Sequence, residues 1–139
     1  MKGKRGAREV ALQALYAWQL SGGDPLEEAR ANEHYEKSRF LEELVGGVRQ
    51  RAGELESLIA PHLDRAFAKL SPVERAILYI GAYELAHHPQ TPFKVVLNEA
   101  VELGKSFGAS EGYRFVNGVL EKIAQALRPD EVARSRNLA

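Results

Sequence analysis

The chain has 139 residues, of which 45% are hydrophobic and 27% are charged, and its formal net charge at pH 7 is zero. This length fits one domain with a sizeable core. The absence of cysteine excludes disulfides and thiolate metal sites, and no apolar run approaches the roughly 20 residues that span a bilayer. We therefore expect a single cytoplasmic domain over residues 1–139, with no signal peptide and no membrane segment.

The charges are unevenly distributed although they sum to zero. Lys2, Lys4, Arg5 and Arg8 lie within the first eight residues, with no acidic residue among them, whereas acidic residues gather between positions 24 and 43. Such an N-terminal basic arm, residues 1–8, is typical of proteins that contact phosphate groups.

The first predicted helix covers residues 5–20, because apolar residues recur there at steps of three and four. Its inner stripe contains Ala7, Val10, Ala11, Ala14, Leu15 and Trp18, and its outer face contains Arg5, Arg8, Leu12, Tyr16 and Gln19. One interpretation is that the basic side chains hold phosphates while a base stacks on Tyr16. The alternative is a basic terminus without a ligand, with Tyr16 half-buried against a neighbouring helix.

The middle of the chain predicts further helices. Asp24 and Pro25 begin a short acidic helix that ends near Glu33, and Ser38 begins a longer one that Pro61 ends. Gly46-Gly47 inside the longer helix predicts a kink or a close helix contact. Residues 63–70 form a short helix or turn.

The stretch from Ser71 to His88 predicts the central helix. Ser71, Pro72 and Glu74 match an N-cap, a first helical residue and a capping box. Apolar residues then occupy nearly every direction around the axis, so the helix is buried, and Gly81 marks close approach of another helix. Glu84 lies on this apolar surface, so its carboxylate must either pair inside the bundle or face a partner protein.

Two more helices follow. Thr91 and Pro92 begin one that ends at Gly108, and Ser110 caps the last, which Pro129 ends. Residues 130–139 are expected to form a frayed tail. No alternation of period two is long enough for a sheet, so the fold is predicted to be all-α with six or seven helices.

No arrangement of residues indicates catalysis, and no cofactor or metal is expected. His87 and His88 point about 100° apart on a helix and cannot both grip one ion. Glu99 and Glu102 are three residues apart, and we expect them to pair with the nearby Lys94 and Lys105 rather than share a proton or bind a cation.

Four segments together resemble one known family. They read RGAREVALQALYAWQLS, LSPVERAILYIGAYEL, PFKVVLNEAVELGKSFG and FVNGVLEKI, and the similarity extends from Arg5 to about Pro129, with residues 24–60 poorly matched. On these motifs the chain is similar to the NusB family of bacterial transcription antitermination factors.

The resemblance implies an all-α fold of two packed three-helix subdomains without enzymatic activity. Members of the family pair with NusE, a small-subunit ribosomal protein, and bind the boxA element of nascent RNA. They act in the RNA polymerase antitermination complex, which reads through terminators in ribosomal RNA operons. The same domain also occurs fused to an RNA cytosine methyltransferase, but this chain is too short to contain that enzyme.

Carried onto this sequence, the resemblance implies two sets of site residues. The RNA-binding set is Lys2, Lys4, Arg5, Arg8, Tyr16, Arg114, Phe115, Asn117 and Glu121. The partner-binding set is Glu74, Arg75 and Glu84. The chain departs from the family pattern at Gly6, which interrupts the basic cluster, and at Tyr79, where many members carry a basic residue.

Two alternatives stay open from the residues themselves. Asn117 could be a buried amide bonded to the backbone of a neighbouring helix instead of contacting a base. The whole protein could also be a protein-only adaptor, or a homodimer that hides the basic surface.

Overall fold

The computed structural model describes residues 3–108 and 112–137, and every regular element within these ranges is helical. The α-helices are α1 (Gly3–Ser21), α2 (Pro25–Ala31), α3 (Arg39–Gln50), α4 (Ala52–Ile59), α5 (Pro72–His87), α6 (Phe93–Phe107), α7 (Gly112–Leu127) and α8 (Pro129–Asn137). Two short 3-10 turns, Ala60–His62 and Phe67–Lys69, connect α4 to α5. The all-α prediction is confirmed, with more helices in the described ranges than the six or seven expected. The predicted cap Ser110 lies outside these ranges.

Helix α5 is the central element and begins as the sequence predicts. The Ser71 hydroxyl accepts a hydrogen bond from the Glu74 N–H, and the Glu74 carboxylate accepts one from the Ser71 N–H, which completes the capping box. Residues 76–85 are all buried. A helix buried on every side must be covered by others, and α1, α3, α4, α6 and α7 all pack against it.

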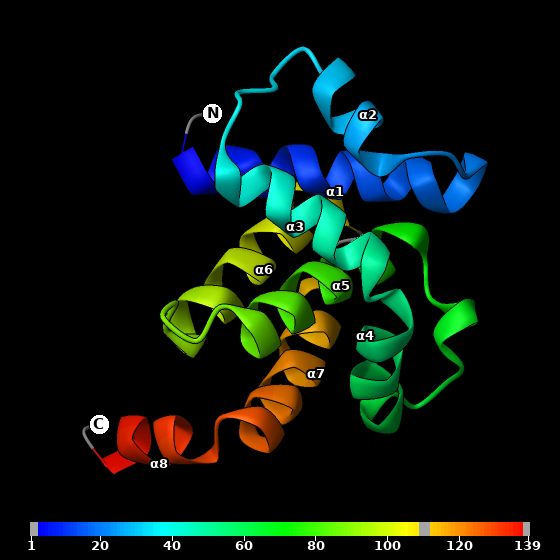
Figure 1. Cartoon of the computed structure of the whole chain (residues 1–139). Coiled ribbons are helices and arrows are strands. Elements are labelled where there is room, and N and C mark those ends of the chain that lie inside the picture. Colours follow the sequence, from blue (N-terminus) through cyan, green and yellow to red (C-terminus); the bar gives the residue numbers. More distant parts are fainter. Residues whose placement is uncertain (1–2, 109–111, 138–139) are drawn as a thin grey trace.

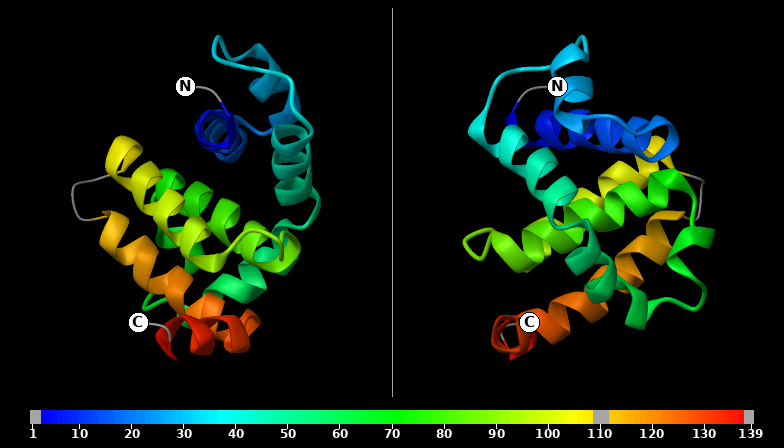
Figure 2. Two further views of the ribbon diagram at one scale, coloured as in Figure 1. Left: turned by 90° about the vertical axis from the view of Figure 1, so that its left-hand side faces the viewer. Right: turned by 45° about the vertical axis from the view of Figure 1, so that its right-hand side comes forward.

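The helices are stacked in layers (Figure 1). Helices α1 and α2 lie at one end, α5 and α6 in the middle, and α7 and α8 at the other end, and this order holds in the rotated views of Figure 2. Helices α1, α2 and α3 pack against one another, as do α5, α6 and α7. Helix α4 connects the two groups through contacts with α3, α5 and α7.

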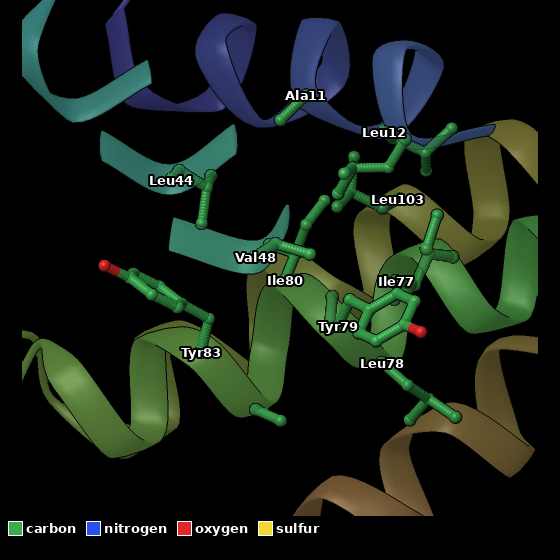
Figure 3. Close-up of a cluster of buried hydrophobic side chains, with 14 of the residues drawn as sticks. Ala11, Leu12, Leu44, Val48, Ile77, Leu78, Tyr79, Ile80, Tyr83 and Leu103 are labelled. Carbon is green, nitrogen blue, oxygen red and sulfur yellow. The ribbon is translucent and has the colours of Figure 1, made fainter. Parts of the chain in front are cut away.

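The core extends further around α1 than the sequence pattern indicates. In Figure 3, Leu12 points from α1 toward Leu103 of α6. Leu12 is only 2% exposed, so its predicted place on the outer face is wrong. The reason is that α6 covers this side of α1 in addition to α5, which widens the buried stripe.

Close approach of two helices at Gly81 is confirmed. A methyl group at this position would lie 2.7 Å from Cδ1 of the buried Leu120 on α7. The absence of a side chain at Gly81 therefore sets how closely α5 and α7 can pack.

The long helix predicted from Ser38 to Ile59 is two helices. Ser38 caps α3 as predicted, but the chain turns at Arg51, where φ is −110° and ψ is 21°, rather than at Gly46-Gly47. The turn directs Leu55 and Ile59 of α4 into the core, where both are fully buried. The glycine pair does not kink α3, but the alternative prediction of a close helix contact is confirmed, because a methyl group at Gly47 would overlap the ring of Tyr83 on α5.

Residues 129–137 form α8 rather than the frayed tail predicted for residues 130–139. Val132 is buried, and the Glu131 carboxylate accepts a hydrogen bond of 2.7 Å from the Phe93 N–H at the start of α6. Helix α6 begins at Phe93 with Pro92, not the predicted Thr91, as N-cap, and proline has no side chain that can accept a capping hydrogen bond. The Glu131 carboxylate therefore takes the place of a local cap. The sequence does not reveal these anchors because they come from contacts with a distant segment.

The histidines at the end of α5 pair with carboxylates of other helices. His87 Nε2 lies 3.1 Å from Glu54 Oε1, and His88 Nε2 lies 2.8 Å from Glu43 Oε2. Among the described residues, no group of three or more His, Asp or Glu side chains is placed to hold a metal ion. Within the same ranges, no helix is both long enough and apolar enough to cross a membrane.

Candidate nucleic-acid and protein interfaces

The basic arm divides into exposed and buried members. Lys2 lies outside the described residues, whereas Lys4 and Arg5 are exposed on the first turn of α1. The Lys4 ammonium lies 5.2 Å from the centre of the Phe40 ring, a cation–π distance that holds it against α3. A cavity of about 290 Å³ lies beside it, and Lys37 contributes a second cation to the lining. The exposed cations of this end therefore come from two segments.

Arg8 lies in the core rather than on the basic surface. It is 4% exposed, and its Nε and Nη2 donate hydrogen bonds of 2.8 and 2.7 Å to the two carboxylate oxygens of Glu84, which is 1% exposed. This is the internal pairing that the position of Glu84 leaves open in the sequence. A two-point pair of this kind satisfies both charges away from water and joins α1 to α5.

Arg5 is held in place by Glu99 of α6. Its Nε and Nη2 donate hydrogen bonds of 3.0 and 2.7 Å to the Glu99 carboxylate. The Arg5 guanidinium, first through these hydrogen bonds, lowers the pKa of the Glu99 carboxyl below its usual value. Glu99 also lies 3.6 Å from Arg8 Nη1, so its expected partners Lys94 and Lys105 are replaced by arginines of α1.

The predicted aromatic contact on α1 is accessible. Tyr16 is 39% exposed and Leu20, one turn later, is 60% exposed. Between them, Gln19 bonds to α5, donating to the Pro72 carbonyl at 2.9 Å and accepting from Arg75 Nε at 2.6 Å. This half of α1 thus presents an exposed apolar pair beside the first turn of α5.

The predicted partner residues differ in accessibility. Glu74 and Arg75 are partly exposed on the first turn of α5, where Glu74 completes the capping box and Arg75 also donates to the Ala68 carbonyl at 2.8 Å. Glu84 is three turns away and buried. Tyr79 is also buried, with its hydroxyl 2.9 Å from Glu56 Oε1, and burial raises its pKa above the usual value. Neither Glu84 nor Tyr79 contributes to a surface in this structure.

The residues predicted on α7 contact their own helix and the segment between α4 and α5. Arg114 Nε donates to the Tyr113 hydroxyl at 3.3 Å, and the guanidinium of Arg65 lies 5.0 Å from the centre of the Phe115 ring. Asn117 Nδ2 donates to Glu121 Oε1 at 3.1 Å. Because this bond is to an exposed side chain of its own helix, the alternative of a buried amide bonded to a neighbouring backbone does not describe Asn117.

The structure places the predicted RNA-binding residues in two layers. Those on α1 and those on α7 are separated by the layer that contains α5 and α6 (Figure 2). Sequence reasoning gave no role at these groups to three residues: Lys37, which lines the cavity beside Lys4, Glu99, which binds Arg5, and Arg65, which lies against the Phe115 ring. Only Lys37 had a local signal, since it follows the acidic segment directly; Glu99 and Arg65 contact distant segments.

A model of the NusB family matches residues 5–125, most of the chain. This chain belongs to the NusB family. It is 47% identical to the transcription antitermination protein NusB of Burkholderia cenocepacia (strain HI2424), with 96% of each chain covered. It is 50% identical to the protein of the same name from Ralstonia nicotianae (strain ATCC BAA-1114 / GMI1000), over 96% of this chain and 89% of that protein.

Solved structures of NusB proteins share the fold. A crystal structure of antitermination factors NusB and NusE in complex with dsRNA contains a chain with 31% identity and a TM-score of 0.80, covering 88% of this chain and 96% of that one. The NusB of T. maritima gives 25% identity and a TM-score of 0.83, covering 95% and 98%. The NusB fold thus extends across nearly the whole chain.

Proposed function

We propose that this protein is a transcription antitermination factor that binds boxA RNA of ribosomal RNA operons together with NusE. It acts in the cytoplasm within the RNA polymerase antitermination complex, helps the polymerase read through terminators and catalyses no reaction. The family membership, the named relatives and the similar complex of NusB, NusE and dsRNA support this role. In this proposal the groups α1–α3 and α5–α7 are the two expected subdomains.

The observation that carries the RNA-binding part is the pair of exposed cations on the first turn of α1. Arg5 is held by Glu99 and Lys4 by Phe40, so both side chains lose little further freedom when they contact a phosphate. Lys37 adds a cation on the α3 side of the cavity beside Lys4, whose lining also contains Glu36. Lys2 lies outside the described residues, and the proposal includes it as an RNA contact from the sequence alone. Phosphate contacts of this kind supply affinity that falls with salt.

Selectivity for a base sequence requires further contacts, which we assign to exposed aromatic and polar side chains. Tyr16 offers a stacking surface on α1. On α7, Arg114 supplies a cation, and the ring of Phe115 lies against the guanidinium of Arg65. Asn117 and Glu121 supply hydrogen-bond donors and acceptors. Arg8 contributes indirectly, because it anchors the helix that carries Lys4 and Arg5.

The NusE-binding part is assigned to the junction of α1 and α5. Glu74 and Arg75 present opposite charges there, and the exposed Leu20 lies on the neighbouring turn of α1 beside Gln19. A polar rim around an exposed apolar side chain is common in protein interfaces. Glu84, three turns further along α5, joins the same two helices through its pair with Arg8 near the start of α1.

The decisive experiment measures binding of a labelled boxA RNA across a salt series, with and without purified NusE. We expect sequence-selective binding that tightens when NusE is added. Weak binding that is indifferent to sequence and to NusE would contradict the proposal and favour a protein-only adaptor. Sedimentation in the same buffer tests whether a homodimer hides the basic surface.

A pair of matched variants locates the RNA surface. Lys4→Ala with Arg5→Ala should weaken RNA binding and lower the salt slope by about 1.4, since each lost phosphate contact of single-stranded RNA contributes about 0.7. The control, Arg49→Ala with Arg51→Ala, removes two exposed cations at the far end of α3 and should leave the slope unchanged. Equal slopes for the two variants would remove the start of α1 from the site.

A further inference from the structure

A second cavity lies at the opposite end of the molecule from α1. Its volume is about 490 Å³, and its walls are the first half of α6, the part of α7 between residues 117 and 125, and α8. This volume is within the range of about 300–1,000 Å³ that is typical of ligand sites. In Figure 1, α8 and the end of α7 lie at the lower end of the view, and α6 lies in the layer above them.

The lining combines side-chain amides with cations. Asn98, Asn117 and Gln125 supply the amides, and Lys94 and Arg136 supply the positive charges. Each amide offers both a donor and an acceptor, which is the pairing that base edges require. The one acidic group, Glu121, accepts a hydrogen bond from Asn117 Nδ2 and so orients that amide, whose carbonyl oxygen takes no part in the bond.

Helix α8, which forms one wall of the cavity, is anchored to the rest of the protein by hydrogen bonds. Arg128, at the junction of α7 and α8, donates hydrogen bonds to carbonyls at the end of α5, and Glu131 accepts one from the Phe93 N–H. Val132 packs into the core beside them. Arg136 is therefore carried by an anchored helix, one turn beyond Val132, rather than by a loose terminus.

We propose that this cavity binds one nucleotide of single-stranded RNA, with the amides contacting the base and Lys94 and Arg136 contacting phosphates. The inference rests on the RNA-binding function proposed above and adds a site that lies on the α8 side of α7. A single-stranded nucleotide fits because only an unstacked base can enter a cavity and expose its edges. The polar lining favours RNA over an apolar ligand. The excess of cations in the lining favours RNA over a positively charged ligand.

The cavity also continues a surface already assigned to RNA. Asn117 and Glu121 line it, and Phe115 and Arg114 lie on the turn of α7 just before them. A strand that contacts Arg114 and Phe115 can therefore continue along α7 into the cavity without leaving the protein surface.

The test compares two double variants in the salt-series assay with boxA RNA. Lys94→Ala with Arg136→Ala should weaken binding about tenfold and lower the salt slope by about 1.4, the value for two lost phosphate contacts. The control, Lys122→Ala with Arg134→Ala, removes two exposed cations from α7 and α8 that do not line the cavity, and should bind as the wild type does.

A third variant, Asn98→Ala, separates base contact from charge. We expect it to reduce the preference for boxA over a scrambled RNA while leaving the salt slope unchanged, because Asn98 is exposed and uncharged. If wild type binds boxA RNA but all three variants behave alike, the cavity is not an RNA site and the proposed function stands. If the wild type binds no RNA, both proposals fail together.

Discussion

The ion pair between Arg8 and Glu84 is the most consequential contact at the scale of single residues. Both side chains are almost fully removed from water, and two hydrogen bonds join them. Removing one partner leaves the other charge uncompensated in the core, which costs about 3–5 kcal/mol. We therefore expect Arg8→Ala to lower the free energy of unfolding by that amount, as measured by urea denaturation monitored by circular dichroism.

The matched control replaces both members with apolar residues of similar size. Arg8→Met with Glu84→Leu should recover most of the loss, because the penalty comes from the unpaired charge and not from the absence of the pair. A double variant as unstable as Arg8→Ala would show instead that the loss comes from packing. The expected loss of stability also makes Arg8 unsuitable for mapping RNA contacts, since its variants would alter folding.

At the scale of elements, Arg128 joins the ends of three helices. Its guanidinium donates to four backbone carbonyls, those of Glu84, Leu85, His88 and Thr91, at 2.6–3.1 Å, and to Glu131 at 3.1 Å. Three of these carbonyls belong to the end of α5, where a helix leaves acceptors unsatisfied and where a positive charge is favourable. Glu131 in turn caps α6. One arginine thus ends α5, positions the start of α6 and anchors α8.

Replacing this residue should release α8. We expect Arg128→Ala to destabilise the protein by about 3 kcal/mol, because it removes the guanidinium donors of the buried Leu85 and Thr91 carbonyls, whereas those of Glu84 and His88 keep a backbone donor. Hydrogen exchange should rise first at the end of α5 and throughout α8. Arg134→Ala, an exposed arginine of the same helix, should change stability by no more than about 0.5 kcal/mol. Faster exchange spread evenly over the described helices would contradict this local role.

For the whole molecule, the sequence predicts those structural features that depend on hydrophobic periodicity and helix capping. The central helix, its capping box and the close approach at Gly81 follow from residues that are near one another in the chain. The break at Arg51, the burial of Leu12 and the order of α8 depend on surfaces supplied by distant helices, so no local pattern could reveal them. The same division applies to the site, where Lys4 was predictable but its neighbour Arg5 is positioned by Glu99, 94 residues away.

The packing of α6 against α7 can be tested at two glycines, one with crowded surroundings and one with open space around it. A methyl group at Gly104 of α6 would lie 2.9 Å from the Tyr113 backbone of α7, whereas one at Gly118 would meet no atom within 4 Å. Gly104→Ala must push α7 away from α6, and overpacking of this kind costs about 1–3 kcal/mol. Gly118→Ala should stabilise the protein by about 0.5–1 kcal/mol, since alanine favours the helix interior.

Urea denaturation of both variants beside the wild type measures these two shifts, which have opposite signs. Because α7 carries Phe115 and Asn117, displacement by Gly104→Ala should also weaken RNA binding at a temperature where the variant is fully folded. Gly118→Ala leaves the helix in place and should retain the wild-type salt slope. If Gly104→Ala were as stable as Gly118→Ala, the contact between α6 and α7 would be loose, and α7 could not hold its side chains in a fixed relation to the cations of α1.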